Sequence, residues 1–171
     1  AEDAGATEVT FLYDQHSYGT DTLHQAEMAQ YQGPALLAHN NASFSDEDWN
    51  GIRRLYDSIK EKDPLKVGRF GLGFKSVFHL TDLPSVISGQ KLLMLDPHEN
   101  FLNARGRPTS GKCWDVEKDN SCLTKLADQF SPYMEPFGYT ASSLMSGPFD
   151  GTLFRFPLRR HPSKLSETTY D

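Results

Sequence analysis

Three glycines within six residues, Gly68, Gly71 and Gly73, have the spacing that most directly suggests chemistry. A glycine loop at the start of a helix exposes backbone N–H groups, and the positive end of the helix dipole adds to their attraction for an anion. A phosphate group is therefore the expected ligand. Phe74 stands where a P-loop has lysine, and the glycine order differs from that of a dinucleotide fold. The loop alone is equally compatible with a hinge or with tight packing.

A second group of polar residues, His39, Asn40 and Asn41, follows a short apolar run at 35–38. A strand that ends there would present polar side chains at one edge of a sheet. Each asparagine could either form a turn before the next element or offer its amide oxygen to a ligand. No other group stands out, because Cys113 and Cys122 lack partners at metal-ligand spacing and the six histidines show no such spacing either. We therefore expect no metal site.

Composition narrows the class of ligand and the compartment. The chain has 171 residues, with 17 Lys and Arg against 23 Asp and Glu, which gives a net charge of −6. An acidic chain is a poor non-specific binder of nucleic acid or of anionic membranes, so a polyanionic ligand must be held locally. The sequence also has no apolar run of membrane-spanning length and does not begin like a signal peptide. We expect a cytoplasmic protein that binds neither nucleic acid nor membrane.

The helix that follows the asparagines is the best defined element of the sequence. Ser45 is a typical N-cap, acidic residues fill the first turn, and Asp48 occupies the capping-box position. Phe44 and Trp49 are placed to form a hydrophobic staple across the cap. Apolar residues then recur at helical spacing, and Pro64 limits the helix at its C-terminal end.

The other predicted elements are mostly strands. They lie at residues 8–13, 35–38, 85–88, 91–95 and 151–158, with a hairpin turn at 89–90 and short helices at 75–80 and around 121–130. The rest of 96–150 is rich in Pro, Gly and Ser and is predicted to be irregular. Length and pattern together predict one domain over 1–160, followed by a flexible tail at 161–171.

Three motifs in order resemble those of the GHKL ATPase superfamily, which includes the ninety-kilodalton heat-shock chaperone, type II topoisomerases, histidine kinases and MutL proteins. D-A-G-A-T-E-V at 3–9 is similar to the end of the first motif, and G-x-x-G-x-G-F-x-S at 68–76 is similar to the chaperone's glycine box. Gly151 and Thr152 match the closing G-T motif. With N-N-A at 40–42 and L-D-P-H at 95–98, the chain is most similar to the sacsin-type branch of heat-shock-protein-90-like domains.

This resemblance implies the α+β fold of the superfamily, the Bergerat fold. That fold is a two-layer sandwich of helices on a mixed, mainly antiparallel sheet, with a nucleotide pocket between the helices, a lid and the sheet. In such a pocket the glycine loop holds the phosphates, Asn40 or Asn41 reads the base, and Thr152 supports it. The implied nucleotide-binding residues are Asp3, Asn40, Asn41, Gly68, Arg69, Phe70, Gly71, Leu72, Gly73, Phe74 and Thr152.

Two departures from the superfamily weaken the expected activity. Its D-x-G-x-G motif, whose carboxylate accepts a hydrogen from the adenine amino group, is replaced here by residues 39–44, which contain neither Asp nor Gly. A neutral amide acceptor in place of a charged one lowers affinity roughly tenfold. The superfamily's magnesium-holding Asn and general-base Glu would stand before Ala1 and are not in this sequence. We expect weak binding of ATP or ADP, Mg²⁺ only with ATP, and at most weak ATP hydrolysis.

The resemblance implies a chaperone-like ATPase-type domain of a large multidomain protein. Its expected partners are adenine nucleotide, other domains of the same protein, and chaperone machinery or client proteins. One alternative is a vestigial pocket in a domain that serves only as an interaction module. A MutL-type or topoisomerase-type DNA enzyme is a further alternative, but it predicts an Asp after the second strand and a basic surface, which the sequence lacks.

Overall fold

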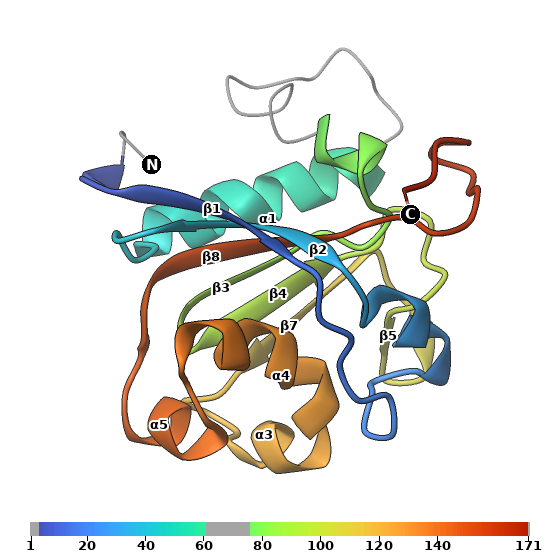
Figure 1. Cartoon of the computed structure of the whole chain (residues 1–171). Helices are drawn as coiled ribbons and strands as arrows, with labels where there is room; N and C mark the ends of the chain where they lie inside the picture. The colour runs from blue at the N-terminus through green and yellow to red at the C-terminus, as the bar shows by residue number, and fades with distance from the viewer. Residues whose placement is uncertain (1–3, 61–75, 171) are drawn as a thin grey trace.

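A six-stranded sheet forms the centre of the computed structural model, which describes residues 4–60 and 76–170 (Figure 1). Every neighbouring pair of strands is antiparallel, and the order across the sheet is β1-β2-β8-β3-β4-β7. The strands of this sheet are β1 (Val9–Asp14), β2 (Ala35–Asn40), β3 (Ser85–Gly89), β4 (Lys91–Leu95), β7 (Gly111–Asp115) and β8 (Phe149–Pro157). A separate two-stranded sheet contains β5 (Asn103–Ala104) and β6 (Arg107–Pro108). The predicted α+β class with a mainly antiparallel sheet is confirmed.

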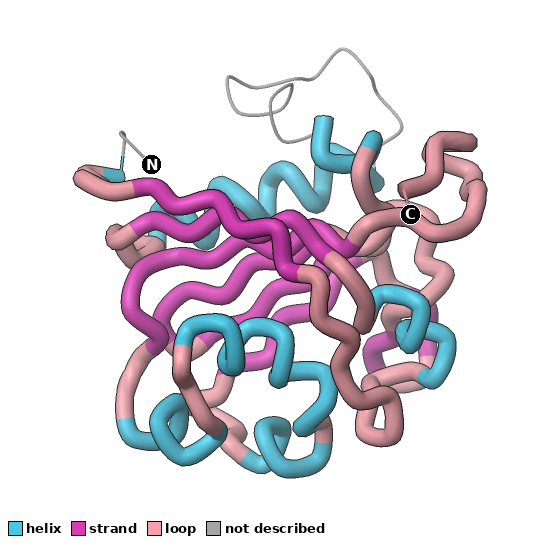
Figure 2. Tube along the Cα trace, viewed as in Figure 1, coloured by secondary structure: helices cyan, strands magenta, loops and turns pink. Residues whose placement is uncertain are grey.

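Helical elements surround the sheet (Figure 2). Helix α1 lies along one face, and the layer formed by α3, α4 and α5 covers the other (Figure 1). The helical elements are η2 (Ala26–Tyr31), α1 (Asp46–Lys60), η3 (Ser76–His79), α3 (Ser121–Lys125), α4 (Ala127–Met134), η4 (Glu135–Phe137) and α5 (Ala141–Ser146). Within the described residues, none of these helices has the length and apolar character needed to cross a bilayer.

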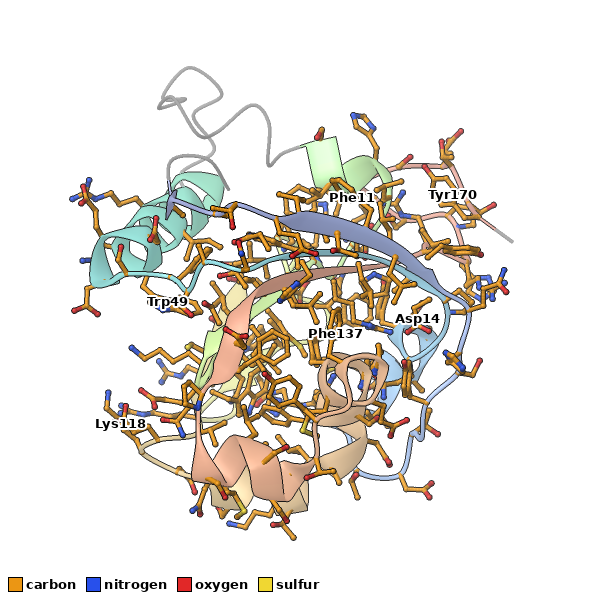
Figure 3. The ribbon with its side chains drawn as sticks, turned by 60° about the vertical axis from the view of Figure 1, so that its left-hand side comes forward. Phe11, Asp14, Trp49, Lys118, Phe137 and Tyr170 are labelled. Atoms are coloured by element: carbon orange, nitrogen blue, oxygen red, sulfur yellow. The ribbon has the colours of Figure 1, made fainter. Side chains whose placement is uncertain are left out.

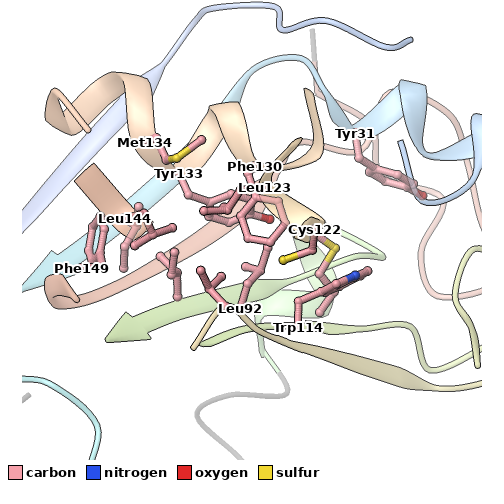
Figure 4. Close-up of a cluster of buried hydrophobic side chains, with 14 of the residues drawn as sticks. Tyr31, Leu92, Trp114, Cys122, Leu123, Phe130, Tyr133, Met134, Leu144 and Phe149 are labelled. Carbon is pink, nitrogen blue, oxygen red and sulfur yellow. The ribbon is translucent and has the colours of Figure 1, made fainter. Parts of the chain in front are cut away.

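Alternation along the strands divides the apolar residues between the two faces. On β8, Leu153 belongs to the large core under α3, α4 and α5, whereas the next residue, Phe154, packs with the smaller cluster under α1. On β4, Leu92 and Leu93 divide in the same way. The large core contains most of the buried aromatic side chains, including Phe130 of α4, which is completely buried (Figure 4).

The start of α1 agrees with its sequence-based prediction. Asp48 Oδ2 accepts hydrogen bonds from the Ser45 backbone N–H at 2.8 Å and from Ser45 Oγ at 2.6 Å, and the Asp48 N–H donates back to Ser45 Oγ at 3.2 Å. The rings of Phe44 and Trp49 lie 5.0 Å apart, edge to face. The predicted capping box and hydrophobic staple are therefore confirmed.

The helix predicted around 121–130 is present as α3 and the first half of α4, but the prediction that the rest of 96–150 is irregular is wrong. The structure has strand β7 there and the helical elements α3, α4, η4 and α5. Pro132 lies inside α4, where its missing N–H leaves the Asp128 carbonyl without the usual helical donor. Two side chains supply donors to that oxygen: Ser131 Oγ of the same helix at 3.0 Å, and Gln32 Nε2 from a distant part of the chain at 2.6 Å. A tertiary hydrogen bond thus stabilises a helix that local propensity argues against.

Two buried arginines connect the sheet to the loops around it. Arg155 on β8 donates to the carbonyls of Tyr31 and Gly33 at 2.8 and 3.0 Å, so its role is structural. Burial lowers the pKa of Arg155. Arg159 forms a 2.7 Å ion pair with Asp82 and donates to carbonyls of η3. Residues 161–170, predicted as a flexible tail, contain further partners of this pair.

Candidate functional site

Polar side chains form a continuous row across the sheet on the face covered by α1. Thr152 on β8 pairs in register with Asn40 on β2 and with Ser88 on β3, and the row continues through β4 to β7. Strand alternation places all of them on the same side as Phe154. We call this set the polar row: Asn40, Thr152, Ser88, Lys91 and Asp115.

The centre of the polar row holds the loop at residues 41–45 against the sheet. The Phe44 backbone N–H donates to Ser88 Oγ at 2.8 Å, and the hydroxyls of Ser88 and Thr152 lie 2.8 Å apart. Thr152 Oγ1 in turn donates to the carbonyl of Ala42 at 2.8 Å. Thr152 is fully buried and Ser88 is 2% exposed. This chain of hydrogen bonds therefore fixes the segment between β2 and α1.

The backbone conformation and close surroundings of residue 151 explain why the G-T motif has glycine there. The φ of Gly151 is +81°, a left-handed conformation that disfavours a side chain. A Cβ atom at this position would also collide with the backbone carbonyl of Asn40. The close approach of β8 to the end of β2 therefore requires glycine, and it places Thr152 directly beside Asn40.

The two asparagines of the predicted site have different surroundings. Asn40 is 9% exposed, and its Oδ1 accepts a hydrogen bond from the Ala42 N–H at 3.1 Å, which leaves this oxygen one further lone pair. Asn41 is exposed, and its Oδ1 accepts from the N–H groups of Thr7 and Glu8 at 2.9 and 3.1 Å. Its Nδ2 donates to Thr7 Oγ1 at 2.8 Å. Asn41 therefore anchors the segment before β1, whereas Asn40 faces the polar row.

The structure brings Asn40 and Thr152 together and directs Asn41 toward the N-terminal segment. The remaining predicted site residues lie outside the described residues, so their positions stay a prediction. These are Asp3, Gly68, Arg69, Phe70, Gly71, Leu72, Gly73 and Phe74. The described chain resumes at Ser76, the first residue of η3, directly after the glycine loop.

A cavity of about 300 Å³ opens beside the other end of the polar row. It lies between the first turns of α1 and the strands β4 and β7, and the Lys91 ammonium is 5.9 Å from the centre of the Trp49 ring. The lining residues are Asp46, Trp49, Asn50, Lys91, Leu93 and Cys113. Of the predicted site residues that the structure describes, none lines this cavity. Sequence reasoning missed Ser88 and Lys91, although their positions on either side of the predicted hairpin turn could have placed them on one face.

A carboxylate at the end of β1 provides a second cluster of titratable groups. The buried Asp14 accepts hydrogen bonds from Tyr18 Oη and His16 Nδ1, each at 2.7 Å. Burial acts to raise the pKa of Asp14, but these hydrogen bonds outweigh it, so the pKa lies below its usual range. Burial and the Asp14 carboxylate raise the pKa of Tyr18. The described residues contain no cluster of three potential metal ligands here or elsewhere.

Comparison with known proteins decides the family. The family model described as "Sacsin domain" matches residues 1–171, which is the whole chain. The chain belongs to the sacsin domain family. Human sacsin is 53% identical over 171 residues, and this sacsin domain spans 4% of the length of that protein. The predicted relation to sacsin-type domains is thus confirmed, and the wider relation to the GHKL superfamily stays a prediction.

Proposed function

We propose that this sacsin domain binds adenine nucleotide weakly on the α1 side of its sheet, as a chaperone-like module of a larger protein. The observation that carries the proposal is the position of Asn40, the last residue of β2, buried on the sheet face that α1 covers. This is where the resemblance to the GHKL superfamily expects the acceptor for the adenine amino group. The amide oxygen retains a lone pair for that hydrogen after it has accepted the Ala42 N–H.

The proposal assigns Thr152 an indirect role. Its side chain is fully buried and its hydroxyl donates to the Ala42 carbonyl, so it supports the base by fixing Asn40 and the segment after it. Residues 68–74 would hold the phosphates through backbone N–H groups, as the sequence suggests. Asp3 would border the same pocket. Mg²⁺ would enter only with ATP, bound mainly through phosphate oxygens and water.

Titration with ADP by calorimetry tests the proposal, and a substitution at Asn40 makes the test specific. Asn40→Asp restores a charged acceptor at the end of β2 and is expected to tighten ADP binding about tenfold, because hydrogen bonds to charged groups are stronger. Asn41→Asp is the matched control. It makes the same chemical change one residue away, where the side chain binds Thr7 and Glu8, and it should leave the affinity unchanged.

Two results would contradict the proposal. One is the absence of saturable ADP binding at millimolar concentration in both the wild type and Asn40→Asp. The other is an equal effect of the two substitutions, because that would show a general response to charge. Thermal unfolding of each variant, measured by circular dichroism, verifies that the fold is retained.

A second candidate, an interaction module with a vestigial pocket, is favoured by one observation. The hydroxyls of Ser88 and Thr152 form hydrogen bonds with each other and with backbone groups of the loop at 41–45. No ligand is therefore needed to complete their hydrogen bonding. Gly71→Leu in the full-length protein separates the two candidates, because a bulky side chain would obstruct a phosphate-binding loop. Loss of cellular activity with retained folding supports nucleotide binding, and unchanged activity supports the interaction module.

A further inference from the structure

Exposed large apolar side chains concentrate on one strand, β1. Among the described residues, only Met145 shows comparable exposure outside this strand. The exposed fractions are 47% for Val9, 70% for Phe11, 40% for Leu12 and 46% for Tyr13. Figure 3 labels Phe11 on this strand, which is an edge strand of the sheet. Such a run on a single strand is unusual for a free surface and suggests that the strand is an interaction site.

Among the residues that the structure describes, none pairs with the backbone of β1 on its outer side. β1 is the first strand of the sheet, with β2 on its inner side. The Asn41 N–H donates to the Glu8 carbonyl at 3.4 Å, so residue 8 and every second residue after it point their backbone groups toward β2. Val9, Phe11 and Tyr13 therefore direct their N–H and C=O groups away from β2, toward the edge of the sheet.

Strand β7 at the opposite edge has the protective features that β1 lacks. Natural edge strands avoid unwanted pairing by carrying charged residues. β7 includes Lys112 and Asp115 among its five residues. β1 has no charge from Val9 to Tyr13, and no proline or irregular register. The two edges of one sheet thus differ in their capacity to accept another strand.

We propose that β1 is a dimerisation strand, which pairs antiparallel with β1 of a second copy of this chain. A two-fold axis at Phe11 places Phe11 opposite its own copy and Val9 opposite Tyr13 on both sides. All of these residues are the ones whose backbone groups point outward, so the pairing forms up to about six interchain hydrogen bonds. The same residues lie on one face, where aromatic and β-branched cross-strand pairs are favourable.

Charge does not oppose this register. The only like charges brought opposite each other are those of Glu8 and Asp14, at the ends of the paired segment. The Asp14 side chain is buried within its own domain, where Tyr18 and His16 bind it. Self-pairing therefore gives the outward backbone groups of β1 hydrogen-bond partners, brings its apolar side chains into contact with those of the second copy, and leaves no charge repulsion at the centre.

Analytical ultracentrifugation of the 171-residue chain over a range of concentrations tests the proposal. The wild type should show a reversible monomer–dimer equilibrium. Phe11→Glu would place two carboxylates opposite each other at the axis and should weaken dimerisation at least tenfold. Met145→Glu is the matched control, since it makes a similar change at an exposed residue of α5, away from β1. It should leave the equilibrium unchanged.

A second variant keeps the test independent of side-chain charge. Phe11→Pro removes the outward N–H at the axis and leaves the hydrogen bonds to β2 intact, so it should also yield monomers with a native circular dichroism spectrum. A wild type that is monomeric at all concentrations would overturn the proposal. So would a dimer that both Phe11 variants leave intact, because its interface would then lie elsewhere.

Discussion

The two faces of the sheet differ in what covers them and in what they contain. Under α3, α4 and α5 lies the large apolar core, whereas the apolar cluster under α1 is small and is bordered by the polar row. Burial of apolar surface is the main source of folding free energy, so the first face supplies most of the stability. The face under α1 can therefore carry buried polar groups and a cavity. Stability and candidate function are thus located on opposite faces of one sheet.

Truncation of one buried apolar side chain on each face tests this difference in stability most directly. Phe130→Ala in the large core should lower the free energy of unfolding by about 3–5 kcal/mol, because Phe130 is completely buried. Ile52→Ala under α1 should cost about 2 kcal/mol, near the lower end for its type. Urea denaturation followed by tryptophan fluorescence measures both. An equal or larger loss at Ile52 would show that α1 contributes as much stability as the opposite layer.

Removal of a buried hydroxyl is expected to lower the free energy of unfolding by less. Two buried serines, Ser88 and Ser110, allow a matched comparison. Ser88→Ala leaves the Phe44 N–H without its acceptor and should cost about 1–3 kcal/mol. Ser110 is equally buried, but its Oγ has no hydrogen-bond partner among the described residues. Ser110→Ala should therefore be neutral or stabilising. The same denaturation experiment applies, and equal costs at the two positions would show that the hydrogen bonds of the polar row add nothing to stability.

The smallest expected effect is a pH dependence of stability that arises from His24, next to the large core. Burial, and then the nearby charge of Lys112, lower the pKa of His24 below 6.5. The unfolded chain thus binds a proton more readily, so stability is full above pH 6.5 and falls as the pH drops below it. His24→Gln should reduce this loss between pH 7 and 5, whereas His161→Gln at an exposed position should not. Identical pH profiles of the two variants would exclude His24 as the cause.

Local sequence signals predicted the elements that local interactions stabilise. Helix α1 could be predicted because Ser45, Asp48 and the staple residues contact one another across a single turn. The hairpin of β3 and β4 followed in the same way from the turn at 89–90. The extension of the helical region beyond residue 130 could not, because α4 continues through Pro132 with the distant Gln32 side chain as one of the donors to the Asp128 carbonyl. That partner is about a hundred residues away in sequence.

The candidate site shows the same limit. The motif pattern singled out Asn40, Asn41 and Thr152, but only strand register reveals that Asn40 and Thr152 are neighbours. The different surroundings of the two asparagines depend on Thr7 and Glu8, which no motif connects to residue 41. Sequence therefore identified the candidate residue types, and the pairing of β2 with β1 and β8 distinguished between them.

The bonds of Arg159 determine where this domain can be excised from a longer polypeptide. Its Nη1 donates to the Thr168 carbonyl, its own carbonyl accepts from the Tyr170 N–H, and its partner Asp82 accepts from Ser163 Oγ. Cleavage after residue 160 would remove all of these contacts from a buried ion pair. A fragment intended for biophysical work should therefore extend beyond Tyr170, and limited proteolysis of a longer polypeptide should spare the peptide bonds between residues 160 and 170.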